Sequence, residues 1–267
     1  MDSDTFVHQD TLEIAELSCG AVVDAARMSV KERRTTFALV RPPGHHAGPG
    51  YGGGFCYLNN VAVAAARLVD EGERVCILDI DVHHGNGTAD IFRREPRILY
   101  VSTHQKGIFP GTGPLEDLGG GAALGHLVHL PFPSGCGDAT YRTAFEELVS
   151  PIVKSFRPGA ILVSLGVDAH YKDPLASLTL SSLGYLDLFD RIAELGGTSA
   201  EGRLCIALEG GYHLAALSEV LASWVGRSQG RTVPLEHTKV HDQEGLGIPL
   251  IQQARKVLSA HWPTLSS

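Results

Sequence analysis

Short apolar runs alternate along the chain with longer segments that have a helical repeat. The runs are rich in β-branched or large apolar residues, as buried strands are, and they cover residues 37–40, 75–80, 98–102, 160–165 and 204–208. Apolar positions recur with a helical period over residues 11–28, 58–69, 139–154, 183–195 and 214–224. Strands that alternate with helices predict an α/β fold in which helices cover both faces of a mainly parallel sheet.

The stretch 226–249 departs from this pattern because it is polar and mixed, with glycine, proline and charge. We expect it to cross the surface before a last helix near residues 250–258. The 267 residues are 43% hydrophobic and 19% charged, which is ordinary for a globular domain. Because no internal repeat divides the chain, a single domain over residues 1–267 is the simplest interpretation.

Metal-binding and proton-carrying side chains come directly after four of the predicted strands. They lie in residues 41–46, 79–84, 166–170 and 209–212. The carboxyl ends of the strands in a parallel sheet form one edge, so residues far apart in sequence meet there. The sequence therefore predicts one site, and the side chains gathered at it suit a metal ion.

Asp81, His83 and Asp168 are the candidate metal ligands. Asp81 and His83 are two residues apart at the end of a strand, so an extended backbone points both side chains the same way. Asp168 arrives from a second strand end and would be a third ligand. Carboxylate and imidazole donors suit zinc or a similar divalent ion, and three protein ligands leave a position for water, as in a catalytic site.

His45, His46 and Tyr212 supply the remaining chemistry of a hydrolase. Two aspartates and a neutral histidine offset the charge of the metal, so bound water is acidified less and a base is needed. His45 and His46 fit that need because imidazole titrates near pH ~6.5. Tyr212 follows a Gly-Gly turn and can donate to a developing oxyanion. Each residue alone has a structural explanation, but their conjunction favours hydrolysis of an amide or ester.

Two loops are rich in glycine, at residues 48–54 and 107–113. Glycine lets the backbone approach a ligand closely. Neither loop has the Lys followed by Ser or Thr of a P-loop, and neither fits the strand–GxGxxG–helix context of a dinucleotide site. We interpret them as the lining of a binding channel, with flexible surface loops as the alternative.

The charge and cysteine content exclude several classes of protein. The net charge of −8 and the 22 dispersed Lys and Arg residues argue against nucleic-acid binding. The N-terminus is acidic and polar, unlike a signal peptide, and no apolar run approaches the ~20 residues of a membrane span. The five cysteines are widely spaced and suit reduced thiols in a cytoplasmic protein, with Cys56 notable because it adjoins the site.

Several long motifs resemble those of the zinc-dependent histone deacetylases. The resemblance runs from Asp2 to at least Leu217, through RPPGHHA, GGFCYLNN, DIDVHHGNGT, FPGTG, GVDAHYKDPL and LEGGYHL. The family includes bacterial deacetylase-like amidohydrolases and acetylpolyamine amidohydrolases. The resemblance implies a three-layer α/β fold of the arginase/deacetylase type with a mainly parallel sheet.

The resemblance also implies a role for each residue of the metal and proton-transfer site. His46 would be the base, His45 its electrostatic partner, and Asp79 the acceptor that orients His45. Asn86 stands behind the base where some relatives carry aspartate, and asparagine is typical of the class II branch. The zinc ligands would be Asp81, His83 and Asp168.

The substrate would enter a narrow tunnel. Phe55 and Phe109 are similar to its aromatic walls, and Gly54 to a backbone contact for the acyl-lysine amide. Tyr212, beside Gly211, matches the tyrosine that polarises the scissile carbonyl. The family also tends to bind a potassium ion behind the zinc site; this chain retains the two side chains involved, Asp79 and Ser102.

The N-terminus departs from the family pattern. Family domains usually begin earlier, with a strand, helices and a rim loop whose acidic residue holds the substrate backbone, whereas Met1 here lies just before the helix that precedes RPPGHHA. We expect either a fragment or a partner, such as a second copy of the chain, that covers the missing region. Smaller departures are His213, where asparagine is common, and Val167, where phenylalanine is common.

Three functions compete. The leading one is a zinc amidohydrolase that removes acetyl or other acyl groups from protein lysines or from acetylated polyamines. An arginase-like enzyme needs an Asp-x-Asp pair late in the chain, and the segment around Asp168 offers one aspartate. A non-catalytic module that binds acyl-lysine or a partner is the third. A well-folded protein that binds metal but does not hydrolyse an acetyl-lysine peptide would favour the non-catalytic binding module.

Overall fold

The computed structural model describes residues 1–243 and 245–266. Within these residues, six parallel strands form one sheet. The strand order is β1-β6-β5-β2-β3-β4, so the strands that carry the candidate ligands, β2 and β5, are neighbours at its centre. The strands are β1 (Thr35–Ala38), β2 (Val75–Asp79), β3 (Ile98–Gln105), β4 (Leu127–Phe132), β5 (Ala160–Leu165) and β6 (Leu204–Leu208).

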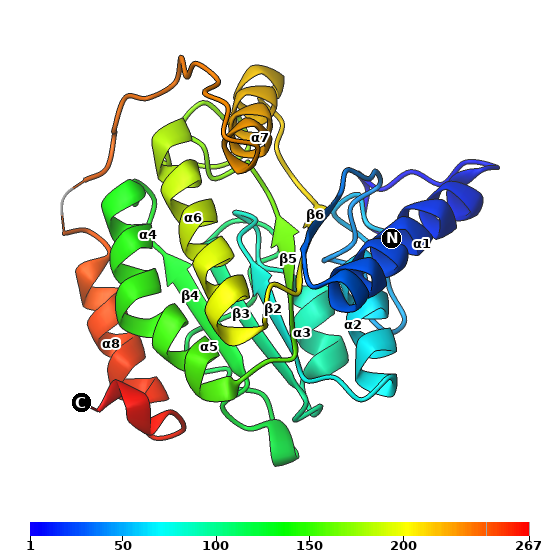
Figure 1. The fold of residues 1–267 in the computed structure, drawn as a ribbon, viewed down its shortest axis with the longest axis horizontal. Helices are drawn as coiled ribbons and strands as arrows, with labels where there is room; N and C mark the ends of the chain where they lie inside the picture. Colours follow the sequence, from blue (N-terminus) through cyan, green and yellow to red (C-terminus); the bar gives the residue numbers. More distant parts are fainter. Residues whose placement is uncertain (244, 267) are drawn as a thin grey trace.

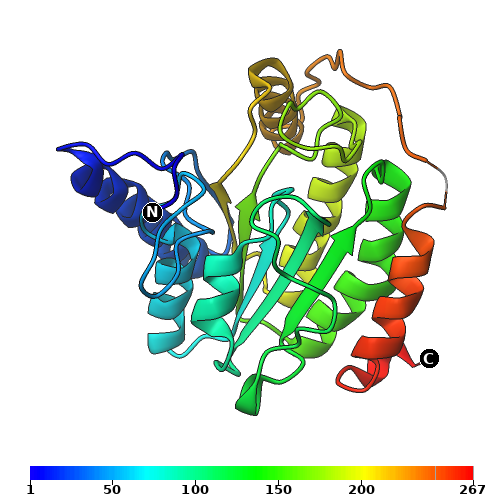
Figure 2. The ribbon, with the colours of Figure 1, turned by 180° about the vertical axis from the view of Figure 1, so that it is seen from behind.

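Helices cover both faces of the sheet, which confirms the expected three-layer α/β arrangement (Figures 1 and 2). One face carries α1 (Thr11–Glu32), α2 (Asn60–Asp70) and α3 (Asn86–Phe92). The other carries α4 (Asp138–Ala144), α5 (Ser150–Phe156), α6 (Ser182–Ser199), α7 (Leu214–Ser228) and α8 (Ile248–Leu258). In the described part of the chain, no helix combines the length and apolarity needed to cross a membrane.

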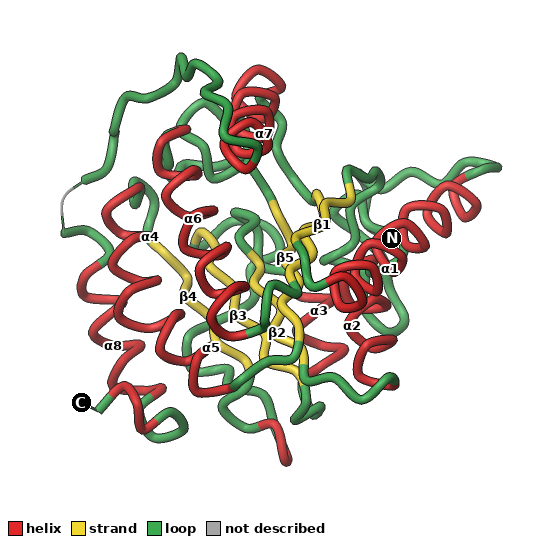
Figure 3. Tube along the Cα trace, in the orientation of Figure 1, coloured by secondary structure: helices red, strands yellow, loops and turns green. Residues whose placement is uncertain are grey.

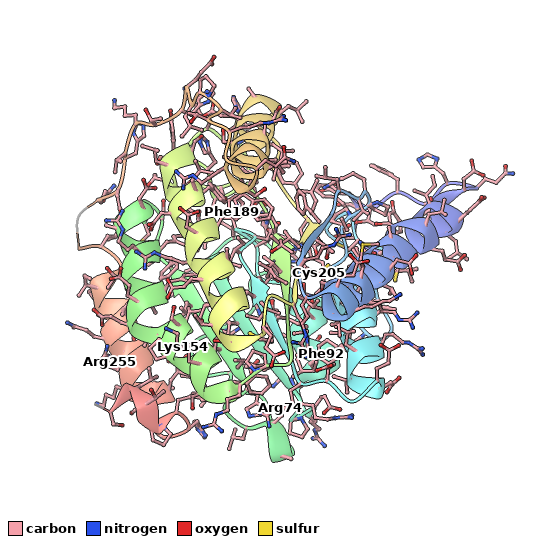
Figure 4. The ribbon with its side chains drawn as sticks, in the orientation of Figure 1. Arg74, Phe92, Lys154, Phe189, Cys205 and Arg255 are labelled. Atoms are coloured by element: carbon pink, nitrogen blue, oxygen red, sulfur yellow. The ribbon has the colours of Figure 1, made fainter. Side chains whose placement is uncertain are left out.

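Alternate residues of each central strand pack into different cores, because side chains on a strand alternate between its two faces. In β2, Val75 and Ile77 belong to the core beneath α1 to α3, whereas Cys76 and Leu78 belong to the core beneath α4 to α8. Figure 4 labels Phe189 from the core beneath α4 to α8, and Phe92 and Cys205 from the core beneath α1 to α3.

The structure contains elements that were not predicted, and several predicted elements have other bounds; β3, for example, continues to Gln105, three residues past its predicted end. β4 and the short helix α3 were not predicted, and β1 begins and ends two residues earlier than expected. The predicted helix over residues 139–154 is α4 and α5 joined by a π-helical segment, Phe145–Val149. Between α7 and α8 the described residues form no helix or strand, as expected for a surface crossing (Figure 3).

Candidate active site

Asp81, His83 and Asp168 meet at the carboxyl edge of the sheet, as predicted. All three side chains are buried, and one ligand atom from each lies within 4.8 Å of the others. Backbone N–H groups fix the carboxylates: Val82 N donates to Asp168 Oδ1 at 2.9 Å, and Gly210 N donates to Asp81 Oδ2 at 2.8 Å. The remaining carboxylate oxygens, Asp81 Oδ1 and Asp168 Oδ2, lie 3.1 and 3.0 Å from His83 Nδ1.

This group of side chains fits a divalent cation. Burial, and then repulsion by the Asp81 carboxylate, raises the pKa of Asp168, and hydrogen bonding and attraction from His83 only partly oppose this rise. Burial disfavours a charged His83, but hydrogen bonds to Asp168 and Asp81 outweigh it and raise its pKa to about 10. The proton on His83 thus supplies the positive charge that the two carboxylates attract. A divalent cation could take the place of this proton, because two carboxylates and an imidazole are donors that suit zinc-like ions.

Two glycines make room for the carboxylates. A Cβ atom added at Gly166 would lie 2.3 Å from Asp81 Oδ2, and one added at Gly210 would lie 2.3 Å from Asp168 Oδ2. Real Cβ atoms essentially never come that close. The Gly166 position, directly after β5, and the Gly210 position, two residues past the end of β6, are therefore closed to any residue with a side chain.

His45 lies behind the ligands in a negatively charged surrounding. Its Nδ1 lies 3.1 Å from Asp79 Oδ2, which also accepts a hydrogen bond from the Tyr100 hydroxyl at 2.8 Å. Burial disfavours the charged imidazolium, but attraction by Asp79, Asp81 and Glu209 outweighs it and raises the pKa of His45 well above its usual range. His45 is therefore a protonated, fixed cation, and Asp79 orients it as expected.

His46 has the opposite electrostatic character. Burial, reinforced by repulsion from charged His45, lowers the pKa of His46 to about 3, so the ring is neutral at neutral pH. Asn86 Oδ1 lies 2.8 Å from His46 Nδ1, and Asn86 Nδ2 donates to the Tyr51 hydroxyl at 3.2 Å. Tyr51 in turn donates to Asp90. This series of hydrogen bonds places the proton of the neutral His46 ring on Nδ1 and leaves Nε2 free to accept another proton.

A pocket of about 280 Å³ opens onto His46 and onto His83 of the ligand group. The predicted walls Phe55 and Phe109 line it, and the Phe109 ring lies edge-on to His46 with their centroids 5.0 Å apart. Its lining is Asp2, Asp4, His46, Gly54, Phe55, His83, Phe109, Leu175 and Tyr212. Two acidic residues from the start of the chain, Asp2 and Asp4, therefore lie at this pocket.

Tyr212 faces the pocket from the turn after β6. Asp173 holds this turn: its Oδ2 accepts from Tyr212 N at 2.7 Å and from His213 N at 3.1 Å. Gly211 does not line the pocket; it has a φ of 126°, which suits glycine, and supports the turn. Burial, and then Asp81 and Asp168, raise the pKa of Tyr212, so its hydroxyl remains a donor.

Glu209 and Asp173 support the site, although the sequence motifs predicted no role for either residue. Glu209 is fully buried and accepts from Gly44 N at 2.6 Å, His45 N at 3.2 Å and Ser164 Oγ at 3.0 Å. It therefore ties the loop of the paired histidines to β5 and β6. The position of Glu209 directly after a predicted strand could have indicated a role at the site. The contact of Asp173 with the Tyr212 turn has no such local indication, because it depends on tertiary structure.

Cys56 adjoins the site but does not contribute a reactive thiolate. Burial, reinforced by Glu209, raises its pKa well above the usual range. In the described part of the chain the five cysteines are all buried and unpaired. His213, one of the two departures near the site, caps α7 by accepting from Ala216 N at 3.2 Å.

Comparisons with known proteins agree with these observations. A family model described as the histone deacetylase domain matches residues 1–227. A probable deacetylase of Archaeoglobus fulgidus is 42% identical over 214 residues, which cover 79% of this chain and 60% of that protein. Histone deacetylase 14, chloroplastic, of Arabidopsis thaliana is 44% identical over 227 residues, which cover 82% of this chain and 53% of that protein. The chain therefore spans between half and two thirds of the length of these relatives.

The fold is also that of a solved relative. The crystal structure of the HDA15 HD domain superimposes with a TM-score of 0.89 at 33% identity, covering 99% of this chain and 73% of that one. This likeness confirms the deacetylase-type α/β fold that the sequence motifs implied.

Proposed function

This chain belongs to the histone deacetylase family, and we propose that it is a zinc-dependent amidohydrolase that removes acyl groups from lysine side chains or acetylated polyamines. One observation carries the proposal: the neutral base His46 lines the same pocket as His83 of the Asp81–His83–Asp168 group, and the aromatic rings of Phe55 and Phe109 line it too. A narrow apolar channel suits an extended aliphatic chain whose amide reaches the ligands.

Asp81, His83 and Asp168 would hold the metal ion. Bound there, zinc would supply Lewis acidity to the acyl oxygen and lower the pKa of water. A potassium ion is a further proposal: Asp79 and Ser102 lie opposite each other on β2 and β3, although Ser102 Oγ is already 2.9 Å from His104 Nδ1.

The protein side chains divide the proton transfers between them. His46 Nε2 accepts the proton of the attacking water and later returns it to the departing amine nitrogen. His45 stays charged throughout because its three carboxylate neighbours favour the cation, and its positive charge stabilises the negative charge that develops on the acyl oxygen. Tyr212 donates its hydroxyl proton in a hydrogen bond to the oxygen that becomes negative.

The test combines metal analysis with substrate profiling. Purified protein is assayed for bound zinc, and the loaded protein is given acetyl-lysine peptides and acetylated polyamines in parallel. Turnover of either class supports the proposal and identifies the substrate. A folded, zinc-loaded protein that binds acetyl-lysine peptides but hydrolyses neither class would be a binding module instead.

We expect Tyr212→Phe to lower kcat by about 10²–10³-fold, because it removes one donor to the oxyanion without removing the ring. Metal content should stay at the wild-type value, since Tyr212 is not among the ligands. Tyr57→Phe is the matched control: this hydroxyl bonds the Phe6 carbonyl, away from the ligands. Equal small losses for both variants would rule out the proposed role of Tyr212.

We expect Asn86→Asp to move the acidic limb of the pH–activity profile to higher pH. A carboxylate at His46 Nδ1, where Asn86 Oδ1 now lies at 2.8 Å, favours the imidazolium and raises the pKa of His46 by about one unit or more. His46 then loses its basic form at a higher pH. The measurement is kcat/KM against pH; an unmoved acidic limb would mean that this limb does not report His46.

A further inference from the structure

Two consecutive residues of the channel wall have left-handed backbone conformations. Gly54 has a φ of 54° and Phe55 a φ of 68°. The first suits glycine, but the second is rare for a bulky aromatic residue and carries an energetic cost. Such a conformation persists only when surrounding groups hold it. The structure supplies those groups from the N-terminal segment.

Asp2 and Thr5 bind the backbone N–H groups of these two wall residues. Gly54 N donates to Asp2 Oδ2 at 2.7 Å, and Phe55 N donates to Thr5 Oγ1 at 3.0 Å. The Thr5 hydroxyl in turn donates to Asp2 Oδ1 at 2.6 Å, so the two side chains act together. Successive N–H groups in left-handed or turn conformations form a concave site that favours an anion. Here the Asp2 carboxylate accepts from Gly54 N, and the Thr5 hydroxyl accepts from Phe55 N.

The same two wall residues contact the catalytic side chains. A Cβ atom at Gly54 would lie 2.4 Å from His46 Cδ2 and 2.8 Å from Phe109 Cε1, so the Gly54 backbone fits tightly between the base and the opposite wall. The Phe55 ring lies 6.0 Å from the Tyr212 ring. A shift of residues 54 and 55 would therefore change the channel width and the packing around His46.

We propose that Asp2 and Thr5 are positioning residues, which hold the Gly54–Phe55 wall in its left-handed conformation and so set the width of the channel beside His46. The effect on catalysis rests on the proposed function, whereas the effect on the loop does not. The burial of Thr5, 4% exposed, agrees with this role. Hydrogen bonding from Thr5, and then from Gly54 N, lowers the pKa of Asp2 and keeps it charged.

Hydrogen exchange of the full chain tests the contact directly. In Asp2→Ala and in Thr5→Val, which is nearly isosteric, the amides of Gly54 and Phe55 should exchange about tenfold faster, the factor for a lost hydrogen bond to a charged or buried group. Asp10→Ala is the control, because it removes the same charge from the same segment and Asp10 makes no side-chain cap bond. Unchanged exchange at both amides in folded Asp2→Ala and Thr5→Val would overturn the proposal.

A conservative variant separates geometry from charge. In Asp2→Asn, Oδ1 can still accept from Gly54 N while Nδ2 donates to Thr5 Oγ1, so slow exchange should largely return. If Asp2 acted only through negative charge at the rim, Asn would behave like Ala. With acetyl-lysine peptide, KM should rise more than kcat falls in Asp2→Ala and Thr5→Val, and Asp2→Asn should recover most of both. If the wild-type protein hydrolyses nothing, the proposed function fails and the exchange rates still decide the role of Asp2.

Discussion

Replacing His46 by alanine should lower kcat by about 10²–10⁴-fold, the usual contribution of a general base. The variant removes the one neutral imidazole that faces the pocket without touching Asp81, His83 or Asp168. Bound zinc, measured by elemental analysis, should therefore stay at the wild-type stoichiometry. Low activity with full metal content is the combination that identifies a base rather than a ligand.

His8→Ala is the matched control for this experiment. His8 is exposed, and its described hydrogen bonds come from the backbone: its N–H donates to Thr11 Oγ1, and its carbonyl accepts from Thr11 N. Its removal should leave both kcat and zinc content unchanged. A His46→Ala protein that keeps nearly the wild-type rate would exclude His46 as the base, and one that loses zinc would place it among the ligands.

Replacing Asp168 by asparagine should weaken zinc binding by more than about 100-fold. Removal of a residue that merely supports a ligand typically costs 10- to 100-fold in metal affinity, and Asp168 is itself a candidate ligand. Asn can keep the acceptor for Val82 N, now 2.9 Å from Asp168 Oδ1, so the backbone need not move. Competition with a chelator of known affinity gives the change, and turnover should fall with zinc occupancy.

A melting temperature of the zinc-free protein distinguishes this effect from misfolding. Burial and the facing carboxylate of Asp81 raise the pKa of Asp168, so the charged form is unfavourable without a cation. Neutral asparagine relieves that repulsion, and zinc-free Asp168→Asn should melt at or above the zinc-free wild type. Unchanged zinc affinity would mean that Asp168 is not the third ligand, and a lowered melting temperature would mean that the carboxylate is needed for the fold.

The metal-binding group could be predicted from sequence because its geometry is largely local. Asp81 and His83 extend a strong apolar strand, and parallel strands bring their carboxyl ends together wherever the chain travels between them. The same reasoning placed Asp168, His46 and Tyr212 at the site, and the structure brings all five together.

The elements that sequence missed have weak local signals. In β4 the segment Leu127–Phe132 contains His129 and Pro131, which hide an otherwise apolar run, although both are accommodated in a strand that forms one edge of the sheet. The short helix Asn86–Phe92 begins with Asn-Gly-Thr, residues of low helical propensity. In both cases tertiary packing overrides local preference.

The contacts made by Asp2, Asp173 and Glu209 could not be predicted because each joins segments distant in sequence. Asp2 reaches residue 54, and Glu209 reaches residues 44 and 164. Nothing in the local pattern fixes which loop lies beside which. The same holds for the first residues of the chain, because Asp2 and Asp4 line a pocket whose other lining residues are distant in sequence.

The two-residue periodicity of β2 has a consequence for how such a sequence can change in length. Val75 and Ile77 share one face of the strand, and Asp79 continues that same odd-numbered series toward Asp81 and His83. Deleting one residue within β2 would turn its apolar side chains toward the wrong layers and reverse the aim of the donor groups beyond it. We therefore expect insertions and deletions to be tolerated in connections such as that between α7 and α8. An insertion or deletion inside β2 should instead disrupt core packing and lower metal affinity at the same time.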